Sequence, residues 1–586
     1  MKKEVERKSN SESTILEHVV CLLPRLGNIE TRGLPVWPPD AFALCLSLLQ
    51  ESAAYCTVLE DWPPSGNANT LEWAEQAENL GVEWRRMWVS GPSVPDAITS
   101  WWEVVLSSFG QPLSYIKQNF LLAQAILSIC GAADEACVDA GTPVNRQIDE
   151  DDVDSYYDFR FAQKADKLLD RKFNGSSLCD EIDCARARVL PKQHTPQNGL
   201  TTRSLSLYIG LSLSHEVKPV WLQSGRYQDD ESLNLLLIPW PYAIKRTQFQ
   251  PKASLPKEMR NMSDQFGFFS FRQGTETKRL IELVFYFYEK AEAEFGKLGG
   301  VVLPEAAVSP GQFKKLRSEL KNRGKRCLLI AGVGNSDKTG DLHDQNTVQI
   351  HIPDGDPVIQ HKHHRWKLTR SQILQYNLGG VLTPGKNWWE HINIGNRSLT
   401  FITLLSTLTM AVLICEDLAR PDPVGDVVRV VGPNLLIALL MDGPQLKERW
   451  PARHAITLAD DPGCSVLAFT SIGMCTLSRP IKADETNRDR VIAIWKDPFE
   501  PAPKEIELPE GCGGVVLSLS LQDGTEWTAD GRSTTSGSPR LTGVYPLGLP
   551  SQIPVELGSL KAQSRQNGKL KNQSKLDLRR LNAIKT

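Results

Sequence analysis

The chain has 586 residues, of which 41% are hydrophobic and 23% charged. This composition provides enough apolar material for buried cores and excludes a fibrous or globally disordered protein. At about 150 residues per domain, the length predicts at least two domains. Sixty-six Lys and Arg against 69 Asp and Glu leave a net charge of −3, so no whole-chain field attracts nucleic acid or acidic lipid.

Targeting and membrane signals are weak along the chain. Residues 1–13 are polar and charged and lack the apolar segment of a signal peptide, so we expect a cytoplasmic protein. The uncharged stretch 398–415 is rich in Ser and Thr and is followed at once by Glu416 and Asp417. We interpret it as buried strands and expect no membrane contact. Twelve cysteines without a Cys-x-x-Cys pair predict reduced thiols and no zinc site.

The N-terminal third is predicted to be α-helical. Apolar residues recur at helical spacing between 38 and 140, for example in 41–49 and 120–127. Seven of the 15 tryptophans occur by residue 102, namely Trp37, Trp62, Trp73, Trp84, Trp88, Trp101 and Trp102. They indicate either a helical core, which we favour, or an aromatic surface for a protein partner. We assign residues 1–200 to a mainly helical region of unknown role.

After residue 205 short apolar strands alternate with amphipathic helices. The β-α-β-α-β order indicates a sheet covered by helices, within a fold of the α/β (α+β) class. The first strands are predicted at 235–238, 300–303 and 327–331, with helices at 277–298 and 310–323. Further strands are predicted at 347–352, 357–360, 409–415, 435–440, 465–470, 490–495 and 514–519. We assign residues 201–550 to this domain.

Two polar segments point to nucleic acid only weakly. From Leu557 onward the chain holds eight Lys or Arg against one acid, Asp577. We assign residues 551–586 to a basic, flexible tail, the one place where we expect nucleic acid could be bound. The segment Tyr227-Gln228-Asp229-Asp230 resembles the metal-binding box of reverse transcriptases, but it is short and no strand upstream offers a further aspartate. We assign it no role.

Three reactive side chains stand where predicted apolar strands end. Glu305 follows 301–304, Lys362 follows 358–360 among several histidines, and Cys415 follows 410–414. Taken singly, they are typical of a capping acid, a surface lysine and a buried core thiol. The histidines could form a metal site, although no cysteine lies nearby to complete a ligand set. In this order, and at strand ends of one domain, the three form a recognisable set.

The set resembles the carbon-nitrogen hydrolase (nitrilase/amidase) superfamily over roughly residues 205–545. The segment 301–305 is similar to the strand that carries the family's glutamate, and 353–362 to the hairpin before its lysine. Segment 413–417, with its Cys-Glu-Asp form, is similar to the nucleophile strand in the glutaminase domains of NAD synthetases. The resemblance implies a four-layer αββα sandwich, a Glu305-Lys362-Cys415 triad, no metal or organic cofactor, and a homo-oligomer.

The chain departs from the family pattern at two places near the lysine. Lys367, five residues after Lys362, is a second candidate for the catalytic lysine. Many relatives also keep a second glutamate just after the lysine, and none occurs here. Glu390, 25 residues before Cys415, could fill that place or be an exposed acid. Residues 1–200 match nothing in the family.

The three residue types suit one reaction. A thiol is mostly protonated at neutral pH, so Glu305 would take its proton while Lys362 stabilises negative charge on the substrate. The sequence therefore predicts hydrolysis of a small amide or nitrile through a thioester on Cys415. We expect the N-terminal helices to cover the mouth above Cys415. The alternative is a non-catalytic module that binds a protein or nucleic acid through the N-terminal helices or the basic tail.

Overall fold

The computed structural model describes residues 12–60, 62, 70–141, 153–169, 176–223, 232–252, 265–335, 344–353, 355–405, 408–478 and 488–550. The motif at 227–230 and the basic tail at 551–586 lie outside these ranges.

The N-terminal part of the chain is helical and has its own core. Its helices are α1 (Ile15–Leu22), α2 (Pro38–Ser52), α3 (Ala54–Val58), α4 (Thr70–Ser90), α5 (Asp96–Ser107), α6 (Ser114–Gln118), α7 (Phe120–Glu135) and α8 (Val153–Leu169). Helices α2 and α7 are buried on almost every side, which explains why they are apolar nearly all round. Trp37, Trp73, Trp84 and Trp102 are buried, as the core interpretation predicts. The hydrophobic cluster extends from Ile15 to Leu211.

Two seven-stranded sheets follow. The first has the order β10 (Val358–His361), β9 (Thr347–His351), β8 (Leu328–Val333), β7 (Gly300–Val308), β4 (Ser232–Leu237), β19 (Cys512–Trp527), β20 (Ser533–Gly548). The second has the order β18 (Lys504–Glu507), β17 (Val491–Lys496), β16 (Ser465–Thr470), β15 (Leu435–Leu440), β14 (Leu408–Ile414), β13 (Ser398–Leu405), β3 (Lys218–Gln223). One hydrophobic cluster draws on both sheets, which therefore pack face to face.

Helices cover the outer faces of both sheets. Helices α9 (Thr277–Phe295) and α10 (Pro310–Asn322) share a core with β7 and β8 of the first sheet. Helices α12 (Glu416–Ala419), α13 (Asp426–Val431) and α14 (Trp450–Asp460) pack on the second, and α15 (Ile472–Leu477) follows β16. The mixed α/β class is confirmed, as are the strands predicted between 235 and 519, several of which are longer than expected.

The uncharged stretch at 398–415 forms β13 and β14, so its interpretation as buried strands is confirmed. None of the helices in the described part of the chain is long and apolar enough to cross a bilayer. All twelve cysteines are free thiols.

A smaller sheet, not predicted from the sequence, lies beside the two large ones. Its strands have the order β11 (Lys367–Leu368), β12 (Asn387–Glu390), β6 (Phe266–Phe271), β5 (Phe249–Pro251), and α11 (Arg370–Gln375) follows β11. Its core includes Trp366 and Tyr376 and reaches Ala306, next to Glu305. The small sheet therefore packs against the strand end that carries the predicted glutamate.

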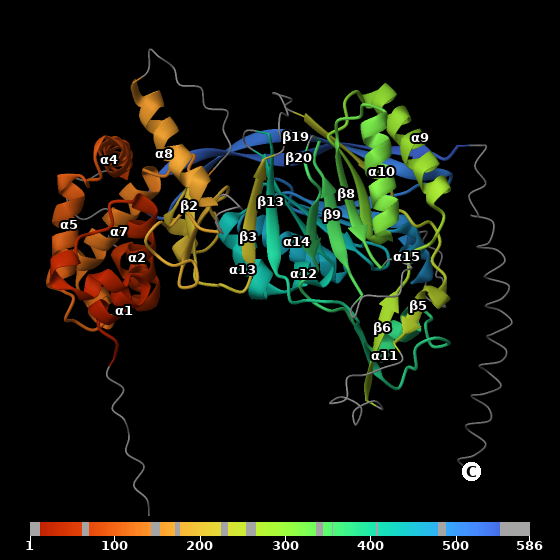
Figure 1. Ribbon diagram of the computed structural model, residues 1–586, viewed down its shortest axis with the longest axis horizontal. Coiled ribbons are helices and arrows are strands. Elements are labelled where there is room, and N and C mark those ends of the chain that lie inside the picture. Colours follow the sequence, from red (N-terminus) through yellow and green to blue (C-terminus); the bar gives the residue numbers. More distant parts are fainter. Residues whose placement is uncertain are drawn as a thin grey trace, which may run out of the picture.

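The helical region is attached elsewhere. A two-stranded sheet of β1 (Arg188–Pro191) and β2 (Ile209–Ser212) packs on α13. The long β19–β20 hairpin reaches the helices, where its buried Arg532 pairs with Asp134 and Glu135 at 2.8 Å each. In Figure 1 helices α1 to α7 lie at one end of the molecule, while β5, β6 and α11 lie toward the other. The expectation that the N-terminal helices cover Cys415 is therefore wrong.

Candidate active site

Glu305 lies in an irregular stretch of β7. The pairing of β7 with β8 is interrupted between Leu303 and Val308, and Ala306 has a positive φ of 50°. Gly332 on β8 permits this close approach, because a Cβ there would lie 2.4 Å from the Glu305 Cα. A positive φ at a residue other than glycine, as at Ala306, costs free energy. Glu305 is therefore carried by a distorted stretch inside β7, between Leu303 and Val308.

Two sets of hydrogen bonds, made by Gln360 and by Asp417, hold the segments of Lys362 and Cys415 together. The buried Gln360 side chain donates to the Val412 carbonyl at 2.7 Å and accepts from the Thr400 N–H at 2.9 Å, which ties β10 to the second sheet. Beyond the lysine, the Asp417 carboxylate accepts from the backbone N–H groups of His363 and His364. The backbone on both sides of Lys362 is thus fastened to the segment around Cys415.

The side chains of His363 and His364, beside Lys362, also contact Asp417. His363 Nδ1 lies 3.2 Å and His364 Nδ1 2.9 Å from the Asp417 carboxylate. Burial would raise the pKa of Asp417, but its hydrogen bonds with the two histidines outweigh burial and lower the pKa to about 2. Within the described ranges no group of three or more His, Cys, Asp or Glu side chains is arranged to hold a metal ion.

The Lys362 ammonium group is fully buried between two carboxylates. Its Nζ lies 2.8 Å from Glu305 Oε1 and 2.8 Å from Glu390 Oε2. The Asn346 amide donates to Glu305 Oε1 at 2.7 Å and to Glu390 Oε1 at 2.8 Å, and the Trp366 N–H donates to Glu390 Oε2. Glu390 is 8% exposed. The small sheet therefore contributes a buried carboxylate to this cluster.

Lys367 lies on the other face of the small sheet. It pairs across the strands with Trp389, and its Nζ lies over the Trp389 ring, 5.3 Å from the centroid. Alternation along β12 places Trp389 on the face opposite to Glu390. The structure thus brings Lys362, and not Lys367, to Glu305.

Cys415 occupies a strained turn between β14 and α12. Its φ is 50° and its ψ −106°, a combination that non-glycine residues rarely adopt and that costs about 1–3 kcal/mol. The Cys415 N–H donates to the Leu439 carbonyl at 2.9 Å, so the neighbouring strand holds the turn in place. Strain that the fold maintains at a nucleophilic side chain favours a functional role.

The charges around Cys415 suit a base and an ammonium group. Burial, followed by the charge of Glu305, raises the pKa of the Cys415 thiol well above its usual range, against the opposing charge of Lys362. Burial and then Glu390 also raise the pKa of Glu305, against Lys362. For Lys362, burial would lower the pKa, but the charges of Glu305, Glu390 and Cys415 together raise it. The resting thiol is therefore protonated, the ammonium group is charged, and the carboxylate is more basic than usual.

Lys362 and Glu305 each keep one atom for chemistry, whereas both oxygens of Glu390 accept hydrogen bonds. An ammonium group has three donors, and the two carboxylates use two of those on Lys362. Glu305 Oε2 has no hydrogen-bond partner in the described part of the chain. One donor and one acceptor are thus available beside the thiol.

Two side chains near the site were missed in the sequence. Asn346 stands directly before β9, which runs antiparallel to β8, so it lies at the sheet edge where β7 and β8 end. That edge position is the signal that could have found it. Tyr376 donates to Asp442 at 2.5 Å, and burial, Asp442 and the nearby Cys415 all raise its pKa. Neither residue belongs to a motif.

No family model matches the chain, and no curated protein matches it. Among solved structures, an amidase from Nesterenkonia sp. is 12% identical, covering 56% of this chain and 95% of its own, with a TM-score of 0.27. Nit3 from Saccharomyces cerevisiae, a member of the nitrilase superfamily, is 15% identical over 49% and 90%, with a TM-score of 0.27. A glutamine-dependent NAD⁺ synthetase from Acinetobacter baumannii is 13% identical over 49% and 46%, with a TM-score of 0.29. Values this low carry no residue's role from those proteins to this chain.

Proposed function

We propose that the chain hydrolyses a non-peptide carbon–nitrogen bond in a small amide or nitrile, through a thioester on Cys415. The supporting observation is the fully buried Lys362 ammonium group, held between Glu305 and Glu390 beside a strained cysteine. Burying three ionised groups costs several kcal/mol each before they pair. Such a cluster is more readily explained by a catalytic role than by stability alone.

In the first half of the reaction an amide is cleaved. Cys415 Sγ attacks the carbonyl carbon while its proton passes to Glu305 Oε2, because the buried thiol is not ionised at rest. The carbonyl oxygen becomes an oxyanion, which the remaining Lys362 N–H stabilises. When the carbon–nitrogen bond breaks, Glu305 returns the proton to the leaving nitrogen. Ammonia or an amine departs and a thioester remains.

In the second half water replaces the sulfur. Glu305 takes a proton from a water molecule while the water oxygen attacks the thioester carbon. Lys362 again stabilises the oxyanion. The carbon–sulfur bond then breaks, the proton returns to Sγ, and a carboxylic acid is released. Glu390 does not donate or accept the transferred proton in this scheme; it positions Lys362 and adds the second negative charge that keeps the lysine protonated.

We propose in addition that the two large sheets with their outer helices form the four-layer nitrilase-like sandwich that the motifs imply. The order of helices, sheet, sheet and helices supports this proposal. The domain limits at residues 200 and 550, the homo-oligomer and a protein partner for the N-terminal helices stay predictions.

The test is ammonia release from a panel of small primary amides and nitriles. We expect turnover by the full chain, and background rates from Cys415→Ala. Cys464→Ala removes an equally buried thiol just before β16 and is the matched control, expected to keep activity. If no substrate in a broad panel is turned over, the non-catalytic alternative is favoured. If Cys415→Ala stays active, the proposed thioester on Cys415 is wrong.

A further inference from the structure

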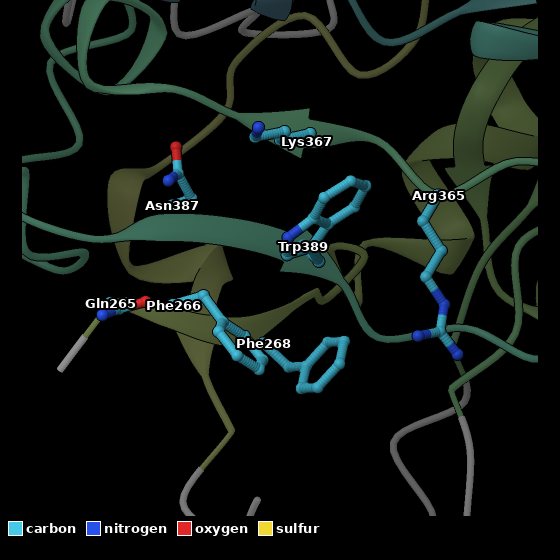
Figure 2. Close-up of a pocket in the computed structure, with 7 residues that line it drawn as sticks. All are labelled: Gln265, Phe266, Phe268, Arg365, Lys367, Asn387 and Trp389. Atoms are coloured by element: carbon cyan, nitrogen blue, oxygen red, sulfur yellow. The ribbon is translucent and has the colours of Figure 1, made fainter. Parts of the chain in front are cut away.

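A pocket lies on the outer face of the small sheet, away from the catalytic cluster. Its volume is about 430 Å³, and it is lined by Gln265, Phe266, Phe268, Arg365, Lys367, Asn387 and Trp389. Figure 2 shows three aromatic rings in this pocket, with the two amide side chains at one side of them and Arg365 at the other. The volume is within the range of small-molecule sites.

The strand pairing explains why the rings gather here. Strands β12 and β6 run parallel, with Asn387 opposite Phe266 and Trp389 opposite Phe268. Partners in register share a face of a sheet, and alternate residues along a strand share it too. Trp389 therefore lies outside while Glu390 lies inside. The pocket lies on one face of the small sheet, and Glu390 of the catalytic cluster lies on the opposite face.

The charge of the pocket is one-sided. Arg365 and Lys367 are cations, and no acid occurs among the described residues that line the pocket. The Arg365 guanidinium lies 5.3 Å from the centre of the Phe268 ring, and its Nε is buried without a hydrogen-bond partner in the described residues. A buried donor that lacks an acceptor is costly, and an anionic ligand would supply one.

We propose that this pocket binds a nucleobase joined to a phosphate. The flat rings of Trp389 and Phe268 suit stacking with a base, since base–aromatic stacking needs only a π face. The amides of Asn387 and Gln265 each offer a donor and an acceptor to the polar edge of the base. Arg365 and Lys367 bind the phosphate. The phosphate and base can belong to a free nucleotide or to one residue of a single strand.

Calorimetric titration of the full chain tests this proposal. We expect AMP to bind, while adenosine and inorganic phosphate each bind at least tenfold more weakly, because each lacks half of the contacts. A four-residue adenylate oligonucleotide distinguishes the sources. Tighter binding of the oligonucleotide than of AMP indicates a strand as the ligand, and equal or weaker binding indicates a free nucleotide.

Variants decide whether the binding occurs in this pocket. Trp389→Ala is expected to weaken AMP binding on the order of tenfold or more. Lys367→Gln changes an exposed side chain, so it leaves the fold intact; it is expected to weaken binding and reduce its dependence on salt. Trp527→Ala removes a tryptophan that is 50% exposed on β19 and is the matched control, expected to bind normally.

Three results would overturn the proposal. The first is the absence of binding by both AMP and the oligonucleotide. The second is unchanged binding in Trp389→Ala. The third is self-association of the chain that Trp389→Ala abolishes while no nucleotide binds, which would make this face a contact between two copies. Binding is measured without turnover, so the outcome is independent of the hydrolase assay.

Discussion

The molecule contains two buried charge clusters that look alike but differ in what they can do. At the tip of the β19–β20 hairpin, Arg532 is surrounded by Asp134, Glu135 and Asp530. In the sandwich, Lys362 is held between Glu305 and Glu390. In both clusters, one buried cation forms ion pairs with more than one carboxylate. Buried charge alone therefore does not mark an active site.

The difference lies in the atoms that remain available. Arg532 also donates to the Leu205 carbonyl, and Asp134 accepts from the N–H groups of Leu207, Tyr208 and Ile209, so the hairpin cluster fastens backbone segments together. Among the described residues, each cluster has one buried carboxylate oxygen without a hydrogen-bond partner, Asp530 Oδ1 in the first and Glu305 Oε2 in the second. A buried thiol lies near each cluster, since Cys130 on α7 interacts with Arg532 and Asp134. Only the thiol near Glu305, that of Cys415, stands at a strained turn. The strained turn at the thiol, and not the unpaired oxygen, distinguishes the candidate active site from the structural cluster.

The largest effect is expected from Cys415→Ala. Turnover should fall to background, because the nucleophile is deleted, while stability falls by only about 1–2 kcal/mol for the lost sulfur. Rates on the best substrate and urea unfolding measure the two effects. An inactive variant that is also grossly unfolded would leave the role of the thiol open, so Cys415→Ser is measured beside it as a variant with a smaller change in packing.

Removing the cation from the hairpin cluster should act on stability. Arg532→Met leaves Asp134, Glu135 and Asp530 buried without their common partner, a loss of about 3–5 kcal/mol. The control is Arg540→Met on β20, the strand that follows Arg532, because the ion pair of Arg540 with Glu500 is exposed and contributes about 0–1 kcal/mol. Tryptophan fluorescence in urea follows the helical region. Equal and small shifts of the urea unfolding transition in both variants would contradict the role of Arg532 in holding the hairpin to the helices.

The two lysines near the sandwich site should separate in catalysis. Lys362→Met is expected to lower kcat by about 10²–10³, or 2.7–4 kcal/mol, because an oxyanion donor is lost. Lys367→Met, on the outer face of the small sheet, should cost at least tenfold less. Steady-state kinetics on one amide is the measurement. A larger loss in Lys367→Met would reverse the assignment.

The smallest effect concerns pH and the hairpin cluster. Burial raises the pKa of Glu135 from an ordinary value of 4.5 to about 7, against the charge of Arg532. The folded state therefore holds this proton more tightly, and its contribution to stability is full below pH 4.5 and lost as pH rises to about 7. Glu135→Gln should flatten this part of the stability profile. Comparison of the two profiles separates Glu135 from Asp40, whose pKa is raised to about 6. Parallel profiles would show that Glu135 is already ionised in the folded state.

The strands and their reactive ends were predictable because both depend on local sequence. Buried strands such as β15 and β16 appear as continuous apolar runs, and Glu305, Lys362 and Cys415 directly follow such runs. Asp417 was visible only as part of a motif. Its role in bracing two histidines follows from the meeting of two sheets, which no local pattern encodes.

Contacts between distant segments were not predictable. The small sheet forms because β12 pairs in parallel with β6, far earlier in the chain, so the burial of Glu390 could not be foreseen from its neighbours. Arg532 and Asp134 are 398 residues apart. The early tryptophans predicted a core, but not that Trp62 and Trp73 would donate to the hairpin residue Asp530. The placement of the helices followed from that hairpin, and the lid prediction failed because of it.

The central claim is that Cys415 forms a thioester, and intact-mass measurement tests it most directly. The full chain is mixed with the amide and nitrile panel and quenched in acid. Its intact mass is measured, and the protein is then digested to locate any adduct. We predict one acyl group per chain on the peptide that contains Cys415, and none in Cys415→Ala. Turnover without an adduct in any form of the protein, or an adduct on another cysteine, would contradict the account.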